Sequence, residues 1–255
     1  MTLNKGFSNL TIFFVPGGPG MRPECIKEFV NSHLSNYTVK GILFTGSGLL
    51  SRKSLSNYLI KALKQHPTDI LIGHSFGAML ILSISGLEKL VKSQILISGA
   101  PNLGWRANLR KFKFSKRQVS DMIAAEKKFE MKPSENELKK MWSSWAPYYF
   151  TKSNIVKGQR WLLKQNYVLK VHLKSNVILK DYNMQTAQLL PTLLVSGKAD
   201  KLTPVEAFNK HTFSKKFMLK VTKIGRAGHF CWLENPKELA SVLRSFILNT
   251  TKDLK

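Results

Sequence analysis

The chain has 255 residues, 43% of them hydrophobic, which is enough to bury a substantial core. Its two cysteines, Cys25 and Cys231, exclude a disulfide framework and a cysteine-based metal site. The 40 lysines and arginines against 15 acidic residues give a formal net charge of +25, which favours weak binding to anionic membrane or polyanions. Drift toward a lysine-rich composition explains the same excess, and without a nucleic-acid motif no specific nucleic acid partner is expected. No signal peptide or membrane span is visible, so we expect a cytoplasmic protein.

Short apolar runs alternate with amphipathic stretches over most of the chain. The expected strands are Leu10–Val15, Gly41–Thr45, Ile70–Ile72, Gln94–Ser98, Thr192–Val195 and Phe217–Val221. The expected helices are Pro23–His33, Leu55–Gln65, Phe76–Lys89, Pro204–Lys210 and Pro236–Leu248. This alternation predicts an α/β fold with a mostly parallel sheet of about six strands and helices on both faces.

Between residues 101 and 186 the rhythm of strands disappears. Ser134 and Glu137 have the spacing of a helix capping box, and aromatic residues are concentrated in this stretch. We therefore expect a helical lid, residues 101–186, inserted into a core formed by residues 1–100 and 187–255. A run of basic residues early in the lid favours an acyl substrate with an anionic portion: Arg106, Arg110, Lys111, Lys113, Lys116 and Arg117.

The segment Gly73-His74-Ser75-Phe76-Gly77 lies between a predicted buried strand and a predicted helix. A strand, a sharp turn and a helix with serine at the apex are typical of a nucleophile elbow, in which glycines allow close contacts of the backbone. The turn exposes the hydroxyl of Ser75 and leaves the amide of Phe76 free to donate to an oxyanion. Ser75 is therefore the predicted nucleophile.

A serine nucleophile requires a histidine base, which in this arrangement follows it in the chain. His229 lies in a loop after the last predicted strand, which is where the base is expected. His74 is part of the elbow and points away from the serine, whereas His211 ends a polar helix and is expected to be solvated. His172, in a lysine-rich amphipathic stretch, remains ambiguous.

The carboxylate that orients the histidine is predicted from the scarcity of acidic residues. The strand at 94–98 has no acidic residue at its carboxyl end, whereas the strand at 192–195 is followed by Ser196-Gly197-Lys198-Ala199-Asp200. Asp200 is thus the one carboxylate that directly follows a core strand and precedes His229. On its own it would be interpreted as an ordinary loop residue, but Ser75 and His229 in this order favour a triad.

These segments resemble the elbow, acid loop and histidine loop of the α/β-hydrolase superfamily, from about residue 10 to about residue 248. The loop Pro16-Gly17-Gly18-Pro19-Gly20 also resembles the His-Gly-Gly-Pro-Gly oxyanion loop of proline iminopeptidases, with Pro16 in place of the histidine. The resemblance implies an α/β-hydrolase fold in which the amides of Gly18 and Phe76 form the oxyanion hole. Gly17 and Pro19, with Trp105 and Tyr149 from the lid, are the expected substrate-binding residues.

The resemblance implies a serine hydrolase that cleaves a carboxylic acyl bond through an acyl-enzyme, without a metal or organic cofactor. A small ester or thioester is the favoured substrate, because the lid is rich in cationic side chains. Cleavage like that of a proline iminopeptidase is the close alternative, since the oxyanion loop points to it. A non-catalytic binding or receptor module on the same fold is the third hypothesis.

Overall fold

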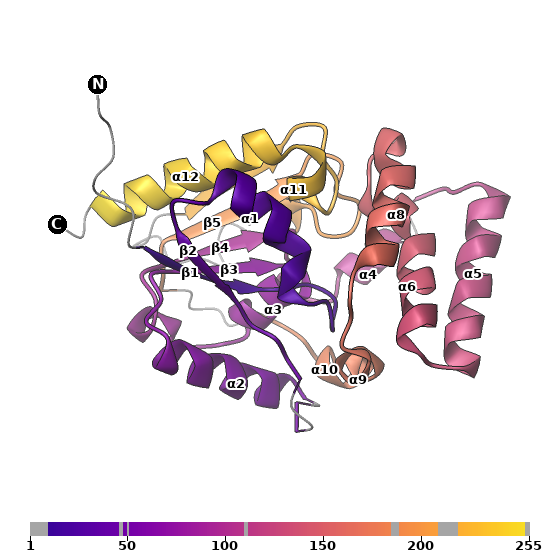
Figure 1. The fold of residues 1–255 in the computed structure, drawn as a ribbon, viewed down its shortest axis with the longest axis horizontal. Helices are drawn as coiled ribbons and strands as arrows, with labels where there is room; N and C mark the ends of the chain where they lie inside the picture. The colour runs from indigo at the N-terminus through magenta and orange to yellow at the C-terminus, as the bar shows by residue number, and fades with distance from the viewer. Residues whose placement is uncertain are drawn as a thin grey trace.

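The computed structural model describes residues 10–45, 48–49, 51–109, 112–184, 189–208 and 219–252. Its centre is a six-stranded sheet with the order β2-β1-β3-β4-β5-β6, and every pair of neighbouring strands is parallel (Figure 1). The strands are β1 (Thr11–Val15), β2 (Thr38–Gly41), β3 (Ile70–His74), β4 (Ser93–Ile97), β5 (Thr192–Gly197) and β6 (Leu219–Ile224). The predicted α/β fold and its six strands are confirmed.

The strands in the middle of the sheet are buried on both faces. All residues of β3, β4 and β5 are buried, as expected for apolar runs in a parallel sheet covered by helices. Successive side chains of a strand point to opposite faces, so Ile12 and Phe14 of β1 join one core cluster while Phe13 and Val15 join the other.

Helices cover both faces of the sheet (Figure 1). The first core cluster contains Phe29 of α1 (Lys27–His33) and Leu243 of α12 (Pro236–Lys252). The second contains Leu59 of α2 (Arg52–Gln65) and most of α3 (Phe76–Leu82). The chain therefore packs as three layers, and the loops at the carboxyl ends of the strands remain available for a site.

The segment between β4 and β5 is helical and lies beyond one end of the sheet (Figure 1). It comprises α4 (Trp105–Leu109), α5 (Lys116–Met131), α6 (Glu135–Ser144), α7 (Ala146–Tyr149), η3 (Lys152–Asn154), α8 (Ile155–Lys164), α9 (Leu169–Leu173) and α10 (Ser175–Ile178). The predicted start at Ser134 is confirmed, since its hydroxyl accepts the Glu137 amide at 3.2 Å. Glu137 itself pairs with Lys140 instead of completing the capping box.

Several predicted boundaries differ from those observed. The predicted strand 41–45 was wrong, because the edge strand runs over Thr38–Gly41 and is followed by coil in the described residues. The predicted helix 76–89 was also wrong in extent: α3 ends at Leu82, and Gly86, with φ of 80°, starts the short helix η2 (Leu87–Lys89). The edge strand β2 is mostly exposed and less apolar than the segment after it, which explains the first error.

Smaller differences affect the other predicted helices. The predicted helix 23–33 is divided into η1 (Pro23–Ile26) and α1. Of the predicted helix 204–210, the described residues 204–208 contain the short helix η4 (Val205–Ala207). A short helix α11 (Cys231–Glu234) precedes α12. Residues 209–218, with His211, lie outside the described residues.

Candidate active site

The turn between β3 and α3 holds Ser75 in a conformation that few non-glycine residues adopt, with φ of 50° and ψ of −115°. A Cβ at Gly73 would lie 2.7 Å from the amide nitrogen of Ala78. A Cβ at Gly77 would collide with the carbonyl oxygen of Val15. Both glycines are thus required by close backbone contacts. Strain of this kind costs about 1–3 kcal/mol and is concentrated at functional sites.

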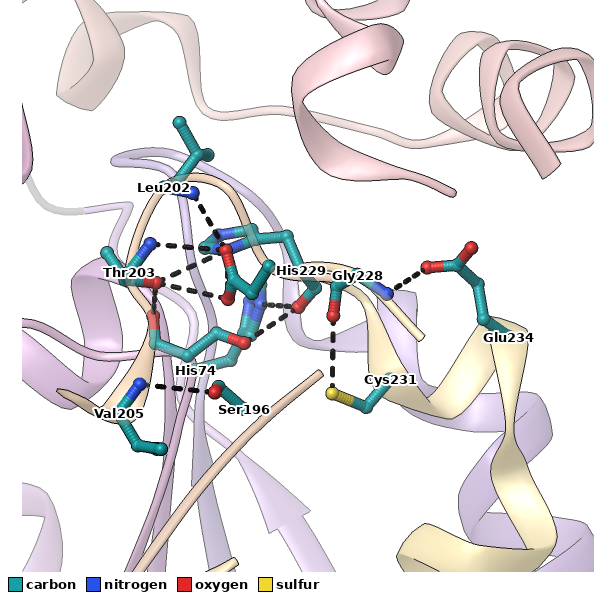
Figure 2. A network of polar contacts seen from close by, with 11 residues as sticks. His74, Ser196, Leu202, Thr203, Val205, Gly228, His229, Cys231 and Glu234 are labelled. Carbon is teal, nitrogen blue, oxygen red and sulfur yellow. Dashed lines mark hydrogen bonds and ion pairs between the residues drawn. The ribbon is translucent and has the colours of Figure 1, made fainter. Parts of the chain in front are cut away.

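Asp200 and His229 form a buried pair at the carboxyl ends of β5 and β6. The Nδ1 atom of His229 lies 3.1 Å from Oδ2 and 3.3 Å from Oδ1 of Asp200, and both residues are buried. Oδ1 of Asp200 also accepts the main-chain amides of Leu202 at 2.9 Å and Thr203 at 3.1 Å (Figure 2). The carboxylate is therefore held in one orientation by its own loop.

The charge of Asp200 determines the tautomer of His229. Burial alone raises the pKa of Asp200, but the charge of His229 and hydrogen bonds from His229 and Thr203 outweigh it and lower the pKa to about 2. An ionised carboxylate only accepts hydrogen bonds, so Nδ1 of a neutral His229 carries the proton. Its Nε2 atom then has a free lone pair and can act as a base.

Thr203 contacts both Asp200 and His229 and was not predicted from the sequence as a site residue. Its hydroxyl donates to the carbonyl oxygen of Ser98 at 2.7 Å and lies 3.3 Å from Oδ2 of Asp200 and 3.4 Å from Nδ1 of His229. Thr203 therefore ties the acid loop to the end of β4. An Asp followed three residues later by Thr is a common local turn pattern and was the available signal.

A cavity of about 360 Å³ brings most of the predicted site residues together. It is lined by Gly18, Pro19, Ser75, Phe76, Met79, Trp105, Arg106, Leu109, Glu126, Met141, Trp142, Trp145, Tyr149, His172, Ser175, Asn176, Leu179, Leu202, Thr203 and His229. Gly17 and Asp200 are not among the lining residues. Gly17 packs against the elbow, where a Cβ would lie 2.6 Å from Nδ1 of His74 and 3.2 Å from Cβ of Ser75. A larger cavity of about 530 Å³ is lined by neither Ser75 nor His229.

The cavity wall is mainly aromatic and aliphatic. Trp142 stacks on Tyr149 with ring centroids 5.6 Å apart. The Nε1 atoms of the three lining tryptophans are buried without a hydrogen-bond partner among the described residues: Trp105, Trp142 and Trp145. The wall is therefore suited to an apolar group.

Few charged side chains line this cavity in the part of the chain that the structure describes. Among the described lining residues, Arg106 is the cationic side chain and Glu126 is the acidic one. Burial lowers the pKa of His172, which favours its neutral form, so it adds no charge near neutral pH. Of the basic run, Arg106 lines the cavity, whereas Arg110 and Lys111 lie outside the described residues. An acyl substrate with an anionic portion therefore stays a prediction.

The histidine loop is connected to the helical segment through Glu234. Its Oε2 accepts the amide of Gly228 at 2.6 Å, and its Oε1 accepts the amide and hydroxyl of Thr151 and the side chain of Asn154 at 2.6–3.0 Å. The amide of His229 also donates to the carbonyl oxygen of Tyr149 at 2.7 Å. The end of α7 and the histidine loop thus form one hydrogen-bonded unit.

Replacement of Glu234 by glutamine is expected to lower the free energy of unfolding by about 1–3 kcal/mol. Glutamine has one acceptor oxygen, so it cannot accept from Gly228 on one side and from Thr151 and Asn154 on the other. Urea unfolding measures the change, with the exposed Glu130→Gln on α5 as the control. An unfolding midpoint equal to that of the unchanged protein would contradict this role.

Two features are absent from the part of the chain that the structure describes. It contains no helix with the length and apolarity needed to cross a membrane. The same described ranges contain no group of His, Cys, Asp and Glu side chains arranged to hold a metal ion.

Comparison with known proteins identifies relatives of the fold. A model described as the alpha/beta hydrolase family matches residues 13–242. No curated protein matches the chain. One similar solved structure is an esterase from Rhodococcus sp. ECU1013, with a TM-score of 0.65 and 15% identity over 95% of this chain and 91% of that chain. A second is MenH from S. aureus, with a TM-score of 0.65 and 16% identity over 95% of this chain and 94% of that chain. A third is a bromoperoxidase from Bacillus anthracis, with a TM-score of 0.63 and 13% identity over 94% of this chain and 92% of that chain. At these identities, the similarity shows a common fold.

Proposed function

Because the chain belongs to the alpha/beta hydrolase family and is therefore a hydrolase, we propose that it cleaves small carboxylic esters or thioesters through an acyl-enzyme on Ser75. The observation that carries the proposal is the hydrogen-bonded pair of Asp200 and His229, of which His229 lines the same cavity as Ser75. A strained serine, a buried histidine and a carboxylate bonded to that histidine have little use in binding alone.

In the first half of the reaction, Oγ of Ser75 attacks the carbonyl carbon of the substrate and its proton passes to Nε2 of His229. The amides of Gly18 and Phe76 stabilise the negative charge on the carbonyl oxygen. As the tetrahedral intermediate collapses, the bond to the leaving group breaks, and the leaving oxygen or sulfur takes the proton from His229. The acyl group remains on Ser75 as an ester.

In the second half, water attacks the acyl-enzyme and gives its proton to His229. The bond between Oγ of Ser75 and the acyl carbon breaks, the serine recovers the proton, and the carboxylic acid leaves. Asp200 stays ionised throughout and stabilises the imidazolium that forms in each half. The helical segment between β4 and β5 acts as a lid that excludes water from the apolar part of the substrate.

The cavity favours a small, uncharged acyl group. A volume of about 360 Å³ is near the lower end of small-molecule pockets, which span about 300–1,000 Å³. Among nitrophenyl esters we expect faster cleavage of the acetate and butyrate than of the laurate, measured as kcat/KM. A rate that rises steadily to the laurate would mean that the lid opens to a longer groove.

One observation favours a second candidate, an aminopeptidase like proline iminopeptidase. Glu126 lines the cavity together with Trp145, and burial raises its pKa. Among the described residues, the ion pairs do not include this carboxylate. A carboxylate in this position can bind the ammonium group of an amino-terminal residue.

The two candidates are separated by comparing a short nitrophenyl ester with proline nitroanilide and its N-acetyl derivative. We expect the ester to be cleaved and both anilides to be inert, with Glu126→Gln leaving the ester rate unchanged. Cleavage of the free-amine anilide that Glu126→Gln abolishes would instead support the peptidase. Neither substrate being cleaved would contradict both assignments.

A further inference from the structure

The main chain of His229 is held from both sides. Its carbonyl oxygen accepts two hydrogen bonds, from Nε2 of His74 at 3.1 Å and from the hydroxyl of Ser98 at 3.0 Å (Figure 2). Its amide donates to the carbonyl oxygen of Tyr149 at 2.7 Å. Every polar main-chain atom of the residue is thus bonded, two of these bonds being to side chains of the core.

His74 has one tautomer in this arrangement. A carbonyl oxygen only accepts, so Nε2 of His74 carries the proton and Nδ1 carries the lone pair. Among the described residues, Nδ1 is buried without a hydrogen-bond partner and faces Gly17, where a Cβ would approach it to 2.6 Å. Burial, with the nearby His229, lowers the pKa of His74 well below its usual value, so the ring stays neutral.

The ring of His74 is fixed by aromatic neighbours. Its centroid lies 4.9 Å from that of His229, 5.0 Å from that of Phe230 and 4.5 Å from that of Trp232, the last at 83°. The side chain is 1% exposed, so rotation would require its neighbours to move. His74 is therefore a rigid donor.

We propose that His74 is a positioning residue that fixes the base His229 relative to the nucleophile Ser75. It is covalently adjacent to Ser75 and hydrogen-bonded to the main chain of His229, so one rigid side chain links the two reacting groups. Ser98 is the second donor to the same oxygen. This inference rests on the proposed function, because it assigns His74 a role in the reaction of Ser75 and His229.

The test replaces His74 by phenylalanine, which keeps a ring of similar size and removes the N–H donor. We expect kcat for a short nitrophenyl ester to fall on the order of 10- to 100-fold while KM changes little, because misplaced reacting groups slow chemistry more than binding. His66→Phe, at the exposed end of α2, is the control and should keep its kcat. An unchanged kcat in folded His74→Phe would overturn the proposal.

A double-mutant cycle with Ser98→Ala makes the test specific to the shared oxygen. In each single variant the carbonyl of His229 keeps one donor, whereas in the double variant it has none. An unsatisfied buried carbonyl is costly, so the loss of kcat in the double variant should exceed the product of the two single losses. Losses that simply multiply would show that the two donors act independently, and would overturn the proposal that they hold the His229 carbonyl together.

A second readout does not depend on activity. In the unchanged protein, the Nδ1 proton of His229, bonded to Asp200, should give a downfield proton resonance protected from exchange with solvent. We expect that resonance to broaden or disappear in His74→Phe, with a thermal midpoint close to that of His66→Phe. If no ester is cleaved but the resonance responds in this way, the proposed function fails, whereas the role of His74 in positioning His229 stands. A resonance that persists unchanged in His74→Phe would overturn the role of His74 in positioning His229.

Discussion

Replacement of Ser75 by alanine is expected to lower the rate of ester hydrolysis by about 10³-fold or more. The variant removes the atom that forms the acyl-enzyme and leaves the cavity, the pair Asp200–His229 and the oxyanion donors in place. The fold should survive, because alanine is smaller and the strained φ of 50° is imposed by the packed turn. The measurement is kcat/KM on a short nitrophenyl ester, with circular dichroism to verify folding.

Ser120→Ala on the exposed side of α5 provides the matched control, since it also removes one hydroxyl but lies outside the cavity. It should retain full activity. A Ser75→Ala variant that is folded and keeps more than about a tenth of the activity would contradict the role of Ser75 as nucleophile, because the oxyanion hole and binding alone supply far less.

Replacement of Asp200 by asparagine is expected to lower kcat by about 10³- to 10⁴-fold. The amide oxygen of the new side chain would still accept the main-chain amides of Leu202 and Thr203, so its NH₂ group would face Nδ1 of His229. That atom must then accept, which places the proton on Nε2 and removes the lone pair that Ser75 requires. The comparison is with Asp121→Asn, an exposed carboxylate on α5.

Asp200→Asn is also expected to change how the stability of the protein depends on pH in acid. Because the pKa of Asp200 is depressed to about 2 in the folded protein, its carboxylate stabilises the fold above the ordinary pKa of about 4, and this contribution is lost as pH falls toward 2. Asp200→Asn should therefore reduce the fall in stability between pH 4 and pH 2, measured by urea unfolding. A kcat within tenfold of that of the unchanged protein, or the same fall in stability between pH 4 and pH 2, would contradict the role of Asp200 in the triad.

The sheet and the elbow were predictable because local signals and tertiary requirements agree. The runs that form β3 and β5 are apolar on both faces, which a covered parallel sheet requires, and the glycines around Ser75 are explained by backbone contacts. The edge strand β2 was misplaced because it is mostly exposed, so its sequence lacks the apolar run by which the buried strands were predicted.

The order of Ser75, Asp200 and His229 was readable from the chain, whereas the contacts that hold them were not. Ser98, His74 and Thr203 act through main-chain oxygens of residues far away in sequence, and a main-chain acceptor leaves no mark in the residue types. Which residues of the basic run face the cavity could not be predicted from the sequence either: Arg106 lines it, whereas Lys113, Lys116 and Arg117 do not.

Labelling with a fluorophosphonate, followed by mass spectrometry of the intact protein and of its peptides, tests the central claim most directly. One adduct per chain, located on Ser75 and lost in Ser75→Ala, is the result that an activated serine in this site predicts. A folded protein that remains unlabelled, or an adduct on another serine, would contradict the account.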